Sequence, residues 1–221
     1  MNFSTFSNKY IERLQDHLKS HPPKWRLLDA DSSVMLVTSL IVGIGSGLGA
    51  VLFRRLIEWF QTLAYRDISG LLTEWYPLHL ILIPALGGAI VGPLVYYFAR
   101  EAKGHGVPEV MEAIELRGGK IRPRVVIVKS LASSVCIASG GSVGREGPIA
   151  QIGSALGSFV GQYLKLSENH VRTLVACGAA GGIAATFNAP IAGAVFALEV
   201  LLRRFGSVYF GAVGISAVTA D

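Results

Sequence analysis

The fold of this chain is restricted above all by uncharged apolar runs that are as long as a bilayer is thick. Residues 34–53 and 78–98 contain no Asp, Glu, Lys or Arg, and about 20 apolar residues suffice for a helix to cross the hydrocarbon core. Residues 147–164 and 173–198 are also uncharged, although glycines and Pro190 interrupt the second run. Because the chain is 51% hydrophobic and only 16% charged, we predict an all-α, polytopic membrane protein.

Glycine and proline divide the apolar sequence into helices that are expected to be tilted, broken or half-spanning. Several are too short to cross a bilayer, and broken helices are tolerated at that depth where they line a cavity. The predicted helices cover residues 34–65, 78–100, 107–117, 123–139, 147–164, 169–184, 190–204 and 208 onward. Glycines four apart should let neighbouring helices approach closely; the pairs are Gly43/Gly47, Gly45/Gly49, Gly88/Gly92, Gly153/Gly157 and Gly157/Gly161.

The position of the basic residues predicts the orientation of the chain in the membrane. Five Lys or Arg residues precede the first span, and six lie between Arg100 and Arg124 after the second. By the positive-inside rule both segments are cytoplasmic. We therefore predict a protein of the cell membrane whose N-terminus lies in the cytoplasm. The basic residues flank apolar spans, which argues against nucleic acid as a partner.

No soluble linker divides the chain, so we expect residues 32–221 to form one membrane domain behind an N-terminal arm of residues 1–31. The arm lacks the pattern of a secretory signal peptide. Ile11, Leu14 and Leu18 share one helical face. The arm is therefore either an amphipathic helix on the membrane surface or a solvated segment.

Patterns that could indicate an enzyme or a cofactor are better explained in other ways. Residues 45–50 satisfy the loose dinucleotide fingerprint, yet that motif needs a strand before it, and here it lies inside a predicted helix. Cys136 and Cys177 lie in apolar segments, which favours buried thiols over a disulfide or a metal site. His17 and His21 are interpreted as solvated. We therefore expect no enzymatic activity, no cofactor and no metal.

The motif Gly144-Arg145-Glu146-Gly147-Pro148 places two charges inside a stretch that otherwise resembles membrane sequence. Charge at that depth is expensive and usually functional. Pro148 suits the start of a helix, so the carboxylate of Glu146 should lie beside exposed N–H groups at a helix N-terminus, where anions bind. A carboxylate in that position competes with an anion, which predicts an anion pathway gated by Glu146. The alternative is a buried Arg145–Glu146 pair that holds two helices together.

Two further motifs predict helix boundaries. In Gly104-His105-Gly106-Val107-Pro108-Glu109, glycines permit an unusual turn, Pro108 suits a helix start and Glu109 complements the helix dipole. This motif either has a functional role or is a simple helix start on a cytoplasmic loop. Around Asn188 and Pro190 we expect a new helix with Asn188 as its N-cap, packed by small residues and not a ligand site.

The three motifs GxGxPE, GREGP and FNAPxAG (residues 187–193), in that order, resemble the CLC family of chloride channels and chloride/proton antiporters from about residue 32 onward. The resemblance implies that Glu146 is the gating glutamate and that Lys129 lies near the anion pathway. It also implies two motifs whose backbone and partial charges hold the anion, formed by Gly104, His105, Gly106, Val107 and Pro108, and by Gly144, Arg145, Gly147 and Pro148.

Two departures from the family pattern bear on function. His105 stands where chloride-selective members usually carry a serine, so the preferred anion is left open. Val200 stands where coupled antiporters commonly carry a proton-relaying glutamate, and Glu199 is the adjacent acidic residue. We therefore expect a chloride-channel-like protein that moves chloride or a related inorganic anion with weak or no proton coupling. The alternative is a proton-coupled antiporter in which Glu199, His105 or water supplies the proton route.

By the same resemblance the 221 residues correspond to the first of two inverted repeats. We expect a homodimer, or a second-repeat partner chain that completes the pathway in the lipid bilayer. A truncated, non-conducting membrane subunit is the remaining alternative, because an isolated half would leave polar backbone facing lipid.

Overall fold

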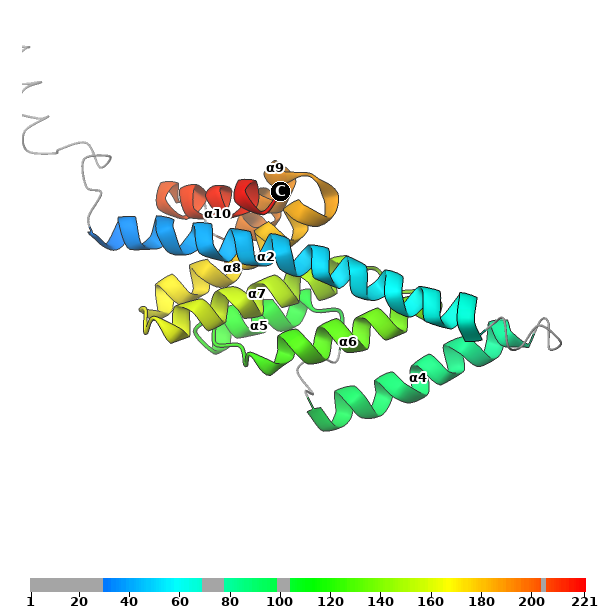
Figure 1. The fold of residues 1–221 in the computed structure, drawn as a ribbon. Helices are drawn as coiled ribbons and strands as arrows, with labels where there is room; N and C mark the ends of the chain where they lie inside the picture. The colour runs from blue at the N-terminus through cyan, green and yellow to red at the C-terminus, as the bar shows by residue number, and fades with distance from the viewer. Residues whose placement is uncertain (1–29, 69–77, 99–103, 204–205) are drawn as a thin grey trace, which may run out of the picture. The chain divides into compact units, whose positions relative to one another are not determined.

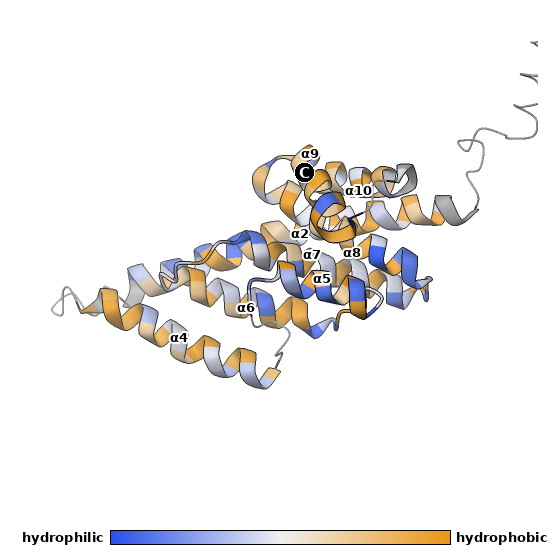
Figure 2. Cartoon of the chain, turned by 180° about the vertical axis from the view of Figure 1, so that it is seen from behind, coloured by the Kyte–Doolittle hydropathy of each residue, from blue (hydrophilic) through white to orange (hydrophobic). Residues whose placement is uncertain are grey.

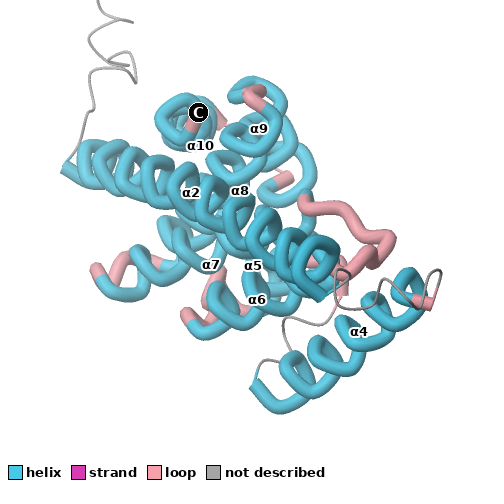
Figure 3. Tube along the Cα trace, turned by 45° about the vertical axis from the view of Figure 1, so that its right-hand side comes forward, coloured by secondary structure: helices cyan, strands magenta, loops and turns pink. Residues whose placement is uncertain are grey.

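The computed structural model describes residues 30–68, 78–98, 104–203 and 206–221. It divides the chain into two compact units, residues 1–34 and 35–221, and the second unit contains all three sequence motifs. The predicted N-terminal arm lies outside the described residues as far as residue 29. Within the described part every regular element is helical, as the cyan tube of Figure 3 shows.

Each predicted helical range overlaps one observed α-helix, and two of the ranges also extend into wider π-helical turns. The π-helical segments follow α2 and α9 directly. The elements are α2 (Ala30–Thr62), η2 (Leu63–Ile68), α4 (His79–Phe98), α5 (Val107–Leu116), α6 (Arg124–Ala138), α7 (Glu146–Tyr163), α8 (Glu168–Phe187), α9 (Pro190–Phe196), η5 (Ala197–Leu202) and α10 (Ser207–Ala220).

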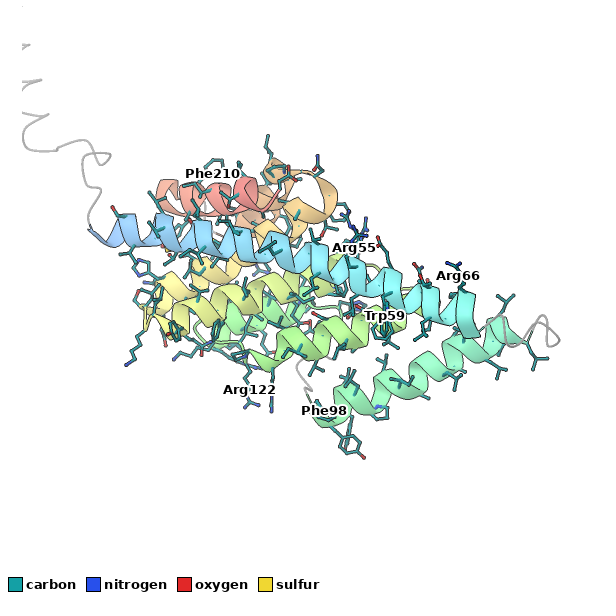
Figure 4. The ribbon with its side chains drawn as sticks, in the orientation of Figure 1. Arg55, Trp59, Arg66, Phe98, Arg122 and Phe210 are labelled. Carbon is teal, nitrogen blue, oxygen red and sulfur yellow. The ribbon has the colours of Figure 1, made fainter. Side chains whose placement is uncertain are left out.

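Two helical stretches are long and apolar enough to cross a bilayer. They cover residues 33–66, along α2 and η2, and residues 80–98 of α4. Hydrophobic residues extend along α4 in Figure 2, and large side chains there are exposed, with Phe98 62% accessible. Phe210 of α10 is also exposed, at 57%, and Figure 4 labels both side chains. Such exposed apolar surface suits contact with lipid.

The core is built around α8, which packs against α7, α9 and α10 (Figure 1). The α7–α8 contact is backbone against backbone. A Cβ atom added at Gly153 would overlap the carbonyl oxygen of Gly178, and one added at Gly178 would overlap that of Gly153. The close approach predicted from the glycine spacing is confirmed here, because only glycine leaves room for it.

On α4 the same spacing meets no partner within the described part of the chain. A Cβ atom at Gly88 or Gly92 would have no described residue within 4 Å. α4 packs chiefly on α6, and there the close contact is made by Gly87, whose added Cβ would overlap Ser139. Glycine spacing alone therefore does not identify the face of a helix that receives a partner.

The predicted N-cap role of Asn188 is also wrong. Asn188 has a φ of 54° and ends α8 in the left-handed conformation, while Ala189 precedes α9 as its N-cap. The N–H of Ala189 donates to the carbonyl of Ala184. Asparagine tolerates the left-handed region well, so the residue terminates one helix and does not begin the next.

Candidate functional site

A cavity of about 920 Å³ brings together residues from the two glycine-rich motifs, from α6 and from α4. Eight of the residues predicted from sequence line it: Gly104, His105, Val107, Lys129, Gly144, Glu146, Gly147 and Pro148. The N-termini of α5 and α7 both open onto this cavity, and helix N-termini present free N–H groups and partial positive charge. The arrangement suits a small anion.

The two motifs meet backbone to backbone. Gly106 has a φ of 102°, and a Cβ atom there would overlap the carbonyl oxygen of Gly147. A Cβ atom at Gly147 would in turn overlap the carbonyl oxygen of His105. Glycine is required at both positions because no side chain fits, and this contact fixes how the two helix N-termini approach each other.

The α5 N-terminus is held by charged side chains. The N–H of Gly106 donates to Oε2 of Glu109 over 2.7 Å. Lys129 of α6, only 3% exposed, donates from Nζ to the carbonyl oxygen of Gly104 over 2.8 Å. His105, between these two anchored residues, is exposed and lines the cavity.

The α7 N-terminus is arranged differently. α7 begins at Glu146, two residues before Pro148. The exposed carboxylate of Glu146 lies so close to Gly144 that a Cβ atom there would overlap it, and it has no hydrogen bond or ion pair with any described residue. The alternative of a buried Arg145–Glu146 pair is wrong, because both side chains are exposed.

Five of the predicted residues do not line the cavity. Gly106 and Pro108 belong to the α5 N-terminus, and Arg145 is the N-cap of α7. Val200 and Glu199 lie on η5: Val200 is partly buried against the main core and Glu199 is exposed. Within residues 35–221, Val200 occupies the position at which coupled antiporters commonly carry a proton-relaying glutamate. That position therefore does not line this cavity.

Sequence reasoning missed part of the cavity wall. Val91, Gly92, Val95 and Tyr96 of α4 line it, as do Ala132, Ser133 and Cys136 of α6, and Ser142 and Val143 before α7. The sequence predicts two buried thiols, and Cys136 is only partly buried, whereas Cys177 is fully so. Ser142, two residues before the GREGP motif, is the one member with a sequence signal, since a hydroxyl beside a helix N-terminus can donate to an anion.

The sequence profile of the family described as voltage gated chloride channel matches residues 87–221. That segment is more than half of the chain and contains both helix N-termini of the cavity. The chain belongs to the voltage gated chloride channel family. The CLC resemblance predicted from the three motifs is thereby confirmed.

Individual relatives agree with the family assignment. A ClcB-like chloride channel protein from Ralstonia nicotianae is 35% identical over 196 residues, covering 85% of this chain and 45% of the relative. The H(+)/Cl(-) exchange transporter ClcA of Klebsiella pneumoniae (strain 342) is 36% identical over 191 residues, covering 81% of this chain and 39% of the relative. The chain thus spans less than half of the length of these relatives.

Solved structures confirm the predicted all-α CLC fold. A slow cyanobacterial Cl-/H+ antiporter matches with a TM-score of 0.68 and 28% identity, covering 84% of this chain and 45% of the antiporter. A CLC-type fluoride/proton antiporter shares the fold with a TM-score of 0.64 at 24% identity, over 85% of this chain and 46% of the other. The described helices correspond to about half of a CLC transporter.

Proposed function

We propose that this chain forms one half of a membrane pathway for chloride or a related small inorganic anion, gated by Glu146. The observation that carries the proposal is the carboxylate of Glu146, which has no partner among the described residues. It stands at the first residue of α7, on a cavity onto which a second helix N-terminus also opens. Family membership supports anion transport as the activity.

The gate works by competition. Backbone N–H groups and helix dipoles attract an anion without the full buried cation that would trap it. A deprotonated Glu146 carries the same charge as the anion and fills the same region. Protonation removes that charge, and rotation away from Gly144 vacates the space, so either event lets an anion enter the cavity.

Weak or absent proton coupling is part of the proposal. Val200 offers no titratable group at the expected relay position, and its side chain packs against the apolar core. The second candidate is proton-coupled exchange, which the names of the Klebsiella pneumoniae and cyanobacterial relatives favour. In that case Glu199, His105 or water carries the proton, and the fluoride/proton relative makes fluoride a further candidate anion.

The other half of the pathway is supplied by a second repeat. That repeat, whether part of the same protein or of a partner chain, would complete the wall of the cavity, and the protein would form a homodimer. Residues 32–221 would act as the membrane domain behind a cytoplasmic arm of residues 1–31. We place the protein in the cell membrane with its N-terminus in the cytoplasm, because its basic residues flank the spans in that sense.

The proposal is tested by anion efflux from liposomes that hold the purified chain, with chloride and pH electrodes read together. Chloride efflux without proton movement is expected once the halves assemble. Efflux with stoichiometric proton movement would replace the uncoupled version with the exchanger. If the chain shows no efflux either alone or together with every co-encoded membrane chain, a role in transport is contradicted. The chain would then be a non-conducting membrane subunit.

A further inference from the structure

The loop that carries His105 is held on both sides by side chains of opposite charge. On one side the Gly106 N–H donates to the Glu109 carboxylate over 2.7 Å. On the other the Lys129 ammonium donates to the Gly104 carbonyl oxygen over 2.8 Å. We call these two hydrogen bonds the His105 clamp.

The loop needs such a clamp because its own backbone is unusually free. Gly104 and Gly106 have φ angles of 106° and 102°, a region in which glycine moves without steric penalty. A Cβ atom at Gly104 would overlap Oε1 of Glu109, so the carboxylate lies directly against the loop. Lys129 is almost fully buried, and a buried cation is retained only where partners satisfy it.

Glu109 acts from outside the cavity. It is absent from the residues that line the 920 Å³ cavity, and it instead lines a separate pocket of about 480 Å³ with Glu112, Arg117 and Arg122. An anion in the first cavity therefore does not touch the Glu109 carboxylate. Any influence of this residue on anion binding passes through the loop that it holds.

We propose that Glu109 is a positioning residue that sets the anion preference of the cavity by fixing the His105 loop. The inference rests on the proposed anion pathway. With the clamp intact, the His105 imidazole and the neighbouring backbone present one fixed arrangement of donors to the cavity. Without the carboxylate, the Gly106 N–H loses its acceptor and the loop regains the conformational freedom of its glycines, so the donors adapt to anions of different size and shape.

The test compares three variants of the full chain in detergent. Glu109→Ala removes the acceptor and the charge, while Glu109→Gln keeps an acceptor for the Gly106 N–H. Glu112→Ala is the matched control, because Glu112 is the next carboxylate on α5 and pairs with exposed Arg117, away from the loop. Hydrogen exchange of the peptide that contains Gly106 reports the clamp. Calorimetric titration with chloride, nitrate and fluoride reports anion preference.

We expect Glu109→Ala to speed exchange at Gly106 and to change the chloride-to-nitrate affinity ratio by about tenfold, the order expected for losing a hydrogen bond to a charged group. Glu109→Gln should change the ratio by about threefold, and its ratio decides the test if Glu109→Ala does not fold. Glu112→Ala should leave both quantities unaltered.

Three results would overturn the proposal. The affinity ratio could stay constant in Glu109→Ala although exchange at Gly106 becomes faster, or Glu112→Ala could change the ratio as much as Glu109→Ala does. In either case the anion pathway itself would survive. A chain that binds no anion before any substitution would contradict the pathway and this inference together, and the exchange data would still show whether the clamp exists.

Discussion

The two helix N-termini at the cavity contain the same kinds of residue and use their glutamates in opposite ways. In α5 the order is Val107, Pro108, Glu109, so the carboxylate sits in the third position of the helix and bonds back to the Gly106 N–H. In α7 the order is Glu146, Gly147, Pro148, and the carboxylate sits in the first position. A glutamate reaches back to its own N-cap from the third position, and Glu146 makes no such bond.

The exchanged order of glutamate and proline therefore distinguishes a fixed helix start from a free one. The Glu109 carboxylate accepts a hydrogen bond from the backbone and fixes the N-terminus of α5. The α7 carboxylate has no partner among the described residues and is available to compete with an anion. A gating carboxylate must be free to move, whereas the backbone that surrounds the anion must stay fixed. Single substitutions at either helix start can break that contrast.

The largest effect is expected from Gly147→Ala, which acts on the contact between the two helix starts. Its Cβ atom would overlap the His105 carbonyl oxygen, and backbone cannot move aside as a flexible side chain does, so we expect a loss of about 3 kcal/mol or failure to fold. Gly88→Ala is the control, because no described residue lies within 4 Å of the added atom. Thermal unfolding in detergent measures both, and equal stability of the two variants would contradict the close contact.

Glu146→Gln should have the next largest effect, on activity and not on stability. The neutral amide cannot repel an anion, so we expect efflux from liposomes to rise about tenfold at neutral pH. Glu58→Gln is the matched control, since Glu58 is an exposed carboxylate on α2 that pairs with Arg55. A Glu146→Gln variant with an unchanged efflux rate would show that the Glu146 carboxylate is not the gate.

A smaller effect is expected from His105→Ser in the clamped loop. The side chain lines the cavity, while the loop stays fixed through Gly104 and Gly106, so anion preference should change about threefold with total flux nearly constant. Reversal potentials in chloride and nitrate measure the ratio. Unchanged preference in this variant would indicate that the backbone alone selects the anion.

The smallest effect is expected from Glu199→Gln on η5. Glu199 is exposed and does not line the cavity, so the ratio of proton to chloride movement should remain the same within error. Paired pH and chloride electrodes give that ratio. If proton movement is present in the unaltered chain and disappears in this variant, Glu199 is the inner proton route and proton-coupled exchange replaces the uncoupled pathway.

Sequence reasoning predicts the helices well because uncharged runs and helix breakers act locally. Gly153 and Gly88 have the same GxxxG spacing, yet among the described residues only Gly153 meets a partner, because the tertiary fold decides which face of a helix is packed. The N-cap prediction for Asn188 fails for a related reason: asparagine suits both a helix start and a left-handed helix end.

The cavity is predictable in its motifs and not in its wall. Residues 104–108 and 144–148 carry glycine, proline and charge, which have strong local meaning, whereas Val91 and Tyr96 look like any residues of an apolar helix. The bond from Lys129 to the Gly104 carbonyl joins residues 25 positions apart. No pattern in the sequence encodes that pairing, and from sequence Glu109 is predicted only to complement the helix dipole.

The reciprocal contact between Gly153 and Gly178 bears on how this protein can change over generations. Where side chains pack, a loss of volume on one helix can be compensated by a gain on its neighbour. At the α7–α8 crossing each glycine touches the other's carbonyl, so no compensating pair of substitutions exists. Substitution at this crossing is therefore closely restricted, whereas the exposed side chain of His105 can be replaced without disturbing the helices, so a new anion preference can arise there while the helix packing stays the same.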